Sequence, residues 1–292
     1  KYENWIINHK KFRKFQKSEA IEKLLIEKSV TSSSAWIRFF DQTMTRLKFK
    51  FNGKSLTETQ ILGLLSSPKK SVRKDAALVF GKTLKENIHS FSFIFNTISK
   101  DLDIEKKIRG FKYSESSRHL NNQIDKSDID SLVQTTTDNY QSICHRYYRY
   151  KSKYFEGSKL NFWDRNAPYP GCNETKINWL EAKEIVISSY SDFDKRFGKI
   201  VKLFFDESWI DAKISKGKTS GAFSHPTVPS CNPKILLNFQ GKIRDVMTLA
   251  HELGHGIHQY LANRNGVLLA DTPLTLAETA SVFGEMLTFK SL

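Results

Sequence analysis

Two histidines four residues apart, within a segment of clear helical periodicity, constrain this chain more than any other feature. Apolar side chains recur at three- and four-residue spacing over residues 242–262, which predicts an amphipathic helix that ends near Gly266. His251 and His255 then project from one face of this helix and can bind the same ion. With Glu252 they form the pattern HExxH, which on a helix is the signature of zinc metalloproteases. The segment therefore predicts a site for one Zn2+ ion.

The glutamate of the motif has a separate predicted role. Glu252 follows His251 directly, so its side chain lies about 100° further around the helix. From there the carboxylate can reach a water on the ion without binding the ion itself. Zinc makes such a water more acidic, and a glutamate can accept its proton and pass it to the leaving amine of a cleaved peptide. Glu252 is therefore the predicted general base of a peptide hydrolase.

A catalytic zinc ion needs a third protein ligand, and three carboxylates follow the motif. Asp271 lies in a predicted loop, whereas Glu278 and Glu285 lie on a second predicted helix that opens at Thr272–Pro273 or at Thr275. The pattern favours Glu278, but Thr275 and Glu278 also have the spacing of a helix capping box. Glu285 is either a partner that orients a ligand histidine or an exposed helix carboxylate.

Three further polar residues lie close to the motif in sequence. His258, three residues after His255, is predicted to be a core or substrate-side histidine and not a ligand. Asp245 either orients His251 or stabilises the start of the helix electrostatically. His225 belongs to the predicted strand before the helix and either faces the cleft or is structural.

Helical periodicity with short polar connectors dominates the first 200 residues and predicts an α-helical array. Strand patterns occur only over residues 221–228 and 234–239, and the prolines beside them indicate edge strands. The expected fold is mainly α, with a small β-sheet next to the HExxH helix as in a zincin-like core. We expect residues 1–155 to form a helical N-terminal portion and residues 156–292 the catalytic core of one continuous helical domain.

Composition limits the classes of partner. The 46 basic and 31 acidic residues give a net charge of +15, and most of the excess lies in residues 1–100. A solvated helical face explains this charge, and no nucleic-acid-binding motif accompanies it, so no nucleic acid partner is expected. No apolar run is long enough to span a membrane. Three cysteines without CxxC spacing, Cys144, Cys172 and Cys231, argue against a disulfide framework and favour a cytoplasmic location.

Several segments together resemble oligoendopeptidase F, of the thimet oligopeptidase superfamily. Residues 244–258 resemble its motif helix and residues 276–285 its third-ligand helix, while residues 162–168 and 221–225 resemble two upstream segments. The resemblance implies a mainly helical zinc peptidase with a deep channel that admits short unfolded peptides and excludes folded proteins. It also implies that His251, His255 and Glu278 are the zinc ligands and that peptide substrates lie along the strand around residues 222–229.

Family members continue well beyond the third-ligand helix, whereas this sequence stops at Leu292, so it looks C-terminally incomplete. That continuation supplies Tyr and His groups for the oxyanion, and the missing C-terminal region is a candidate partner of this chain. The leading hypothesis is a zinc-dependent endopeptidase of short unfolded oligopeptides. The alternative is a truncated, catalytically silent peptide-binding fragment of such an enzyme. A third hypothesis, a nucleic-acid-binding helical protein, rests only on the N-terminal charge.

Overall fold

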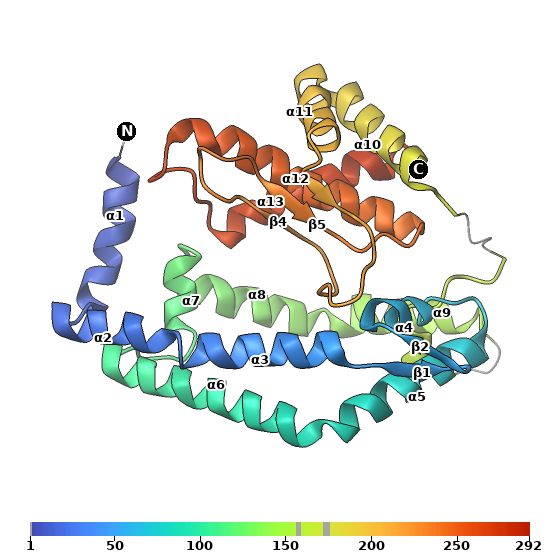
Figure 1. Cartoon of the computed structure of the whole chain (residues 1–292), viewed down its shortest axis with the longest axis horizontal. Helices are drawn as coiled ribbons and strands as arrows, with labels where there is room; N and C mark the ends of the chain where they lie inside the picture. The colour runs from blue at the N-terminus through green and yellow to red at the C-terminus, as the bar shows by residue number, and fades with distance from the viewer. Residues whose placement is uncertain (1, 156–158, 172–175) are drawn as a thin grey trace. The chain divides into compact units, whose positions relative to one another are not determined.

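Helices form most of the described chain, so the prediction of a mainly α fold is confirmed. The computed structural model describes residues 2–155, 159–171 and 176–292 (Figure 1). Contacts divide the chain into two compact units, residues 11–172 and residues 1–10 together with 173–292. Cys172 and the expected boundary at residue 156 lie outside the described residues. No described helix is both long and apolar enough to cross a membrane.

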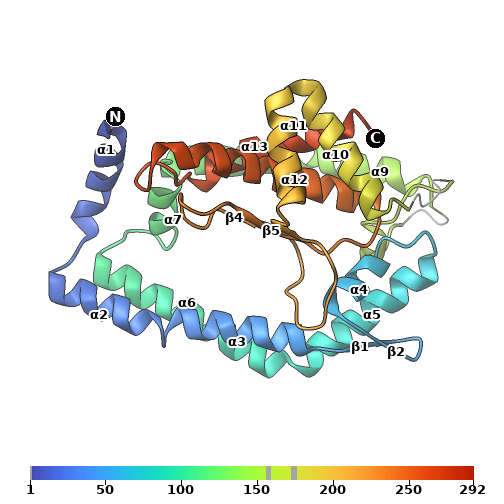
Figure 2. The same cartoon turned by 45° about the horizontal axis from the view of Figure 1, so that its top comes forward.

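The first half of the chain is a series of helices with one β-hairpin. α3 and α6 run side by side (Figures 1 and 2). Up to residue 171 the elements are α1 (Glu3–Phe12), η1 (Arg13–Phe15), α2 (Glu19–Ser29), α3 (Ser33–Arg46), β1 (Phe49–Phe51), β2 (Lys54–Leu56), α4 (Glu58–Leu64), α5 (Lys70–Glu86), α6 (Ile88–Arg109), α7 (Ser116–Asn121), α8 (Lys126–Asp138), the π-helical η2 (Tyr140–His145), α9 (Arg146–Ser152) and η3 (Phe162–Asp164).

The β1–β2 hairpin was not predicted, because each strand is only three residues long. Its turn does leave a sequence signal. Asn52 and Gly53 both have positive φ, at 47° and 74°, as a tight two-residue hairpin turn requires. The side chains of Phe49, Ile61 and Ala76 are fully buried together and form the core beneath the hairpin.

A buried ion pair links α5 to η3 within the same unit. Arg73 donates hydrogen bonds from Nε and Nη2 to Oδ1 of Asp164, at 3.2 and 2.7 Å. Its Nη1 donates to the carbonyls of Ser67 and Pro68. The second oxygen of Asp164 accepts from the backbone N–H and the side chain of Asn161. Both charges are therefore fully hydrogen-bonded, as buried charges must be.

The unit that contains residues 176–292 surrounds the predicted motif helix with helices on one side and a small sheet on the other. Its elements are α10 (Trp179–Phe193), α11 (Lys195–Asp206), β3 (Ile210–Asp211), β4 (Phe223–His225), β5 (Lys234–Leu236), α12 (Ile243–Ala262), η4 (Asn263–Asn265) and α13 (Leu274–Phe289). Helical periodicity extends without a break over residues 179–205 and by itself predicts one helix there. The chain instead breaks at Asp194, whose side chain caps α11.

The sheet has the order β3-β5-β4, with β5 parallel to β3 and antiparallel to β4. β4 is an edge strand as predicted, but the edge prediction for residues 234–239 is wrong, because β5 is central. Pro233 immediately precedes β5, where its missing N–H removes no hydrogen bond from the sheet. The proline therefore marks the beginning of the strand and not its position in the sheet.

α12 supplies the core of this unit. Its buried side chains Val246, Leu249, Leu253 and Ile257 pack with residues of α10, α11 and β5. α13 lies beside α12 in both views (Figures 1 and 2). Gly256 is required where α12 meets α11, because a Cβ there would lie 2.6 Å from the Phe204 ring. This packing positions the two motif histidines next to α13.

Candidate metal centre

α12 carries both motif histidines on one face, because residues four apart in an α-helix are about one turn apart. The side chain of His251 is 25% exposed and that of His255 is 13% exposed. The aliphatic face of the same helix is buried, so the two rings project from its rim toward α13. The local sequence thus presents two imidazole nitrogens at one place.

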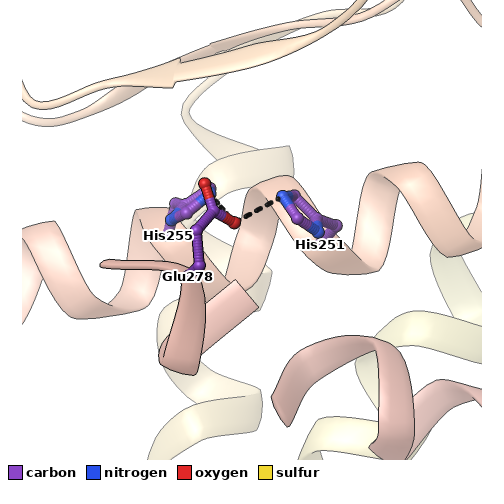
Figure 3. A group of neighbouring side chains, drawn as sticks. All are labelled: His251, His255 and Glu278. Atoms are coloured by element: carbon purple, nitrogen blue, oxygen red, sulfur yellow. Dashed lines mark ion pairs between the residues drawn. The ribbon is translucent and has the colours of Figure 1, made fainter. Parts of the chain in front are cut away.

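α13 brings a carboxylate to these rings. Oε2 of Glu278 lies 3.4 Å from Nε2 of His251 and 3.5 Å from Nε2 of His255 (Figure 3). Among the described residues, these three form the group whose ligand atoms all lie within 4.8 Å of one another. Asp271 lies in the loop before α13 and is not part of this group.

The alternative role of Glu278 in a capping box is contradicted. α13 begins at Leu274 with Pro273 at the N-cap, so Thr275 lies inside the helix and does not cap it. The ring of Pro273 restricts the backbone where the chain enters α13, so the helix begins before Thr275. Glu278 is consequently one turn into α13, with its carboxylate directed at α12 (Figure 3).

The two carboxylate–imidazole distances within the group match those expected between ligands of one zinc ion. Ligand atoms about 2.0–2.1 Å from a tetrahedral zinc ion lie about 3.3–3.4 Å apart. The two carboxylate–imidazole separations, 3.4 and 3.5 Å, match this spacing closely. Two imidazoles with one carboxylate are also the donor set of many catalytic zinc sites, which leave a further coordination position open.

Glu285 contacts the other nitrogen of a motif histidine. Its Oε1 lies 2.5 Å from Nδ1 of His251. With the proton on Nδ1, the ring donates a hydrogen bond to this carboxylate. The lone pair of Nε2, on the side of Glu278, is then available to bind a metal ion. Burial lowers the pKa of His255, which favours the neutral ring that metal binding requires.

Glu252 lies in the most enclosed part of the site, with only 6% of its surface exposed. Burial raises the pKa of its carboxyl group to about 7, although the charge of His251 opposes this rise. The neighbouring carboxylates of Glu278 and Glu285 raise the pKa further, because a third negative charge is unfavourable beside them. Glu252 therefore can take up and release a proton near neutral pH.

Strand β4 is held along α12 beside Glu252. Ser224 Oγ donates to Oε1 of Gln259 at 2.8 Å, and Nε2 of Gln259 donates back to the Ser224 carbonyl at 3.1 Å. Gln259 lies two turns after Glu252 on the same face of α12. Gln259 was not among the predicted site residues, although its seven-residue spacing from Glu252 is a sequence signal that identifies it.

The remaining predicted residues surround the group without joining it. His258 lines an apolar cavity of about 440 Å³ between α12, α13 and α10, next to Phe193 and Phe283. Asp245 accepts hydrogen bonds from the backbone N–H groups of Gln240 and Lys242, which favours its predicted role at the helix start. His225 is exposed on β4, where Nδ1 accepts from the backbone of Thr227.

Models of two known families match the sequence. The model described as peptidase family M3 matches residues 63–292, and the model described as oligopeptidase F matches residues 1–49. These matches cover the motif helix, α13 and most of the preceding helices. They confirm the resemblance to oligoendopeptidase F drawn from the motif residues.

Individual relatives are similar over most of this chain. Oligopeptidase PepF of Bacillus subtilis is 26% identical over 238 residues, which are 81% of this chain and 35% of that protein. An oligoendopeptidase F homolog of Borreliella burgdorferi is 28% identical over 274 residues, which are 92% of this chain and 46% of that protein. The chain thus spans less than half the length of these two relatives.

Solved structures share the fold. A Bacillus anthracis protein assigned as an oligoendopeptidase F has a TM-score of 0.87 at 18% identity, over 99% of this chain and 53% of that one. PZ peptidase A, solved with an inhibitor, has a TM-score of 0.81 at 19% identity, over 95% of this chain and 49% of that one. At these identities the likeness establishes the fold alone.

Proposed function

Because the chain belongs to peptidase family M3, we propose that it carries the active site of a zinc-dependent endopeptidase that hydrolyses short, unfolded oligopeptides. The observation that carries this proposal is the group of His251, His255 and Glu278, whose spacing suits one Zn2+ ion. When bound there, zinc would supply Lewis-acid chemistry and make water a better nucleophile. The names of the similar proteins support the same class of substrate.

Glu252 is the proposed catalytic base and proton carrier. In the metal-free site, burial raises the pKa of its carboxyl group to about 7, which suits a group that accepts a proton and later returns it to a leaving amine. Glu285 is proposed to hold His251 in the tautomer that binds a metal, through the contact to Nδ1. Neither role requires a residue outside α12 and α13.

The free edge of β4 is the proposed place for the peptide backbone. Within the described residues β4 pairs with no strand other than β5, so it is an edge strand next to α12, and its Ser224 carbonyl accepts a hydrogen bond from Gln259. A peptide can add to such an edge as an extra strand. The proposed partner of this chain is therefore an extended peptide.

We further propose that residues 156–292 form the catalytic core and residues 1–155 a helical N-terminal portion. The proposed location is the cytoplasm.

Replacement of the proposed base tests the proposal. Glu252→Gln should lower the hydrolysis of a fluorescence-quenched octapeptide by at least about 100-fold, because the amide cannot accept the proton. Its zinc content should stay near that of the unaltered chain, measured by atomic emission. Glu207→Gln, an exposed glutamate at the end of α11, is the matched control. Unchanged hydrolysis by Glu252→Gln would rule out the assigned base.

The second candidate is a peptide-binding fragment without turnover. It is favoured by the share of each relative that the chain spans, 35% and 46% in the two cases above, since groups that stabilise the oxyanion can lie in the remainder. Zinc binding together with peptide binding, measured by fluorescence anisotropy but without cleavage products in mass spectrometry, would favour this candidate over the enzyme.

A further inference from the structure

Three helices meet at a single buried point beside the metal centre. The hydroxyl group of Tyr190, on α10, donates a hydrogen bond of 2.7 Å to the backbone carbonyl of Ala250, on α12. Tyr190 is only 1% exposed. α13 contributes Gly284, where an added Cβ would overlap the Tyr190 hydroxyl and lie 2.7 Å from the Ala250 oxygen. A side chain at position 284 would therefore separate the helices that meet here.

The two residues whose backbones meet at this point, Ala250 and Gly284, each come immediately before a residue of the site. Ala250 comes directly before His251, and Gly284 comes directly before Glu285, which contacts Nδ1 of that histidine. The hydrogen bond of Tyr190 thus fixes the two backbones from which the His251–Glu285 pair extends. Burial raises the pKa of Tyr190, so its hydroxyl stays protonated and remains a donor.

A second glycine contact lies one turn further along α12. A Cβ on Gly254 would overlap the backbone carbonyl of Ala280 and lie 2.8 Å from Cα of Ser281. Gly254 comes directly before His255, and Ala280 lies two residues after Glu278. Each of the two glycine contacts therefore lies directly before one of the motif histidines along α12, and together they keep α12 and α13 close enough for Glu278 to reach both rings.

We propose that Tyr190 is a positioning residue for the metal centre. Its hydroxyl group bonds to Ala250 and packs against Gly284, and these contacts set the distance between α12, which carries the histidines, and α13, which carries Glu278 and Glu285. This inference rests on the proposed zinc site. A hydroxyl group is needed because a phenylalanine would fill the same space without holding the carbonyl, which has a free lone pair beside its helical hydrogen bond. Tyr190 acts through His251 and Glu285 and does not touch the ion.

The test compares zinc affinity, metal geometry and stability in the whole 292-residue chain. Tyr190→Phe should weaken zinc binding by about 10-fold or more, since partners that orient metal ligands typically contribute 10- to 100-fold. Affinity is measured by competition with a colorimetric chelator, and geometry by the visible absorption of the Co2+-loaded chain, which should change. The melting temperature of the metal-free chain is recorded in parallel.

Ser189→Ala is the matched control. Ser189 is the neighbouring residue and is 3% exposed, and its hydroxyl group has no hydrogen-bond partner among the described residues other than the carbonyl of Ile185 in its own helix. Loss of the Ser189 hydroxyl group should lower the melting temperature, while zinc affinity and the Co2+ spectrum stay unchanged. A general loss of stability would instead move all three readouts in both variants, and this would overturn the positioning role.

Gly284→Ala gives an independent test that does not depend on the folding of Tyr190→Phe. It should weaken zinc binding at least as much, and adding Tyr190→Phe to it should cause no further loss, because the methyl group overlaps the hydroxyl that the second change removes. Wild-type affinity in either single variant would overturn the inference alone. Failure of the unaltered chain to bind zinc would overturn the proposed site and the inference with it.

Discussion

Two clusters of charged side chains in this chain differ in how their charges are balanced. The Arg73–Asp164 pair, in the unit of residues 11–172, is 1% and 3% exposed, and each of its oxygens and nitrogens has a described partner. The cluster on α12 and α13 instead brings three carboxylates, Glu252, Glu278 and Glu285, around two imidazoles.

The difference separates a structural cluster from one suited to a ligand. In the first cluster the opposite charges and the hydrogen bonds already satisfy each other, so nothing further needs to bind. In the second, negative charge exceeds positive charge whenever the histidines are neutral, and a cation would relieve the repulsion between carboxylates that adds to the effect of burial on the pKa of Glu252. The first cluster should therefore stabilise the chain by itself, and the second only with a metal ion.

Removal of one partner from the balanced pair should have the largest effect on stability. Arg73→Met should lower the free energy of unfolding by about 3–5 kcal/mol, because it leaves the Asp164 carboxylate buried without its cation. Urea denaturation of the metal-free chain measures this loss. The double change Arg73→Met and Asp164→Leu should lose less than the single change, since no charge then remains buried.

The control for this prediction is an exposed ion pair. Arg196 bonds to Asp194, but its side chain is 83% exposed, so Arg196→Met should not change the urea midpoint measurably. Equal losses in the buried and the exposed variant would mean that the pair in the first unit has no special structural role.

The second cluster should contribute stability only when zinc is present. With free zinc at 100 times its dissociation constant, the unaltered chain should gain about 2.7 kcal/mol. His255→Ala should lose this gain together with the bound ion, whereas His258→Ala should keep both, because His258 lies beside the group and not in it. Thermal unfolding with and without zinc checks this prediction. A zinc-dependent shift that survives His255→Ala would contradict the assigned ligands.

The smallest effect is the pH dependence of the balanced pair. Burial alone would raise the pKa of Asp164, but hydrogen bonds from Arg73 and Asn161 and the charge of Arg73 hold it below its usual range. An unfolded aspartate titrates near about 3.9, so the stability from this pair is complete above that pH and is lost as the pH falls toward the folded pKa. The difference in urea midpoint between the metal-free chain and Asp164→Asn should thus narrow between about pH 5 and pH 3. A constant difference would show that the pKa of Asp164 is the same in the folded and the unfolded chain.

Local patterns predicted the elements that are long and periodic. The predicted helix over residues 242–262 agrees with α12 to within one residue at its start, because its buried face repeats with helical spacing. The hairpin of β1 and β2 and the two-residue β3 were missed, since strands this short show no alternation. The central position of β5 depends on pairing between distant segments, which no local pattern contains.

By itself, the sequence determined that His251 and His255 share a helix face and that Glu252 adjoins them, because these relations depend only on the geometry of one helix. For the third carboxylate the pattern favoured Glu278 over Asp271 and Glu285, and the resemblance to oligoendopeptidase F implied the same residue. Only the tertiary structure brought Glu278 within 3.5 Å of both rings and Glu285 to the far side of one. That arrangement depends on how closely α12 and α13 approach, which the contacts of Gly254, Gly284 and Tyr190 set through space and not along the chain.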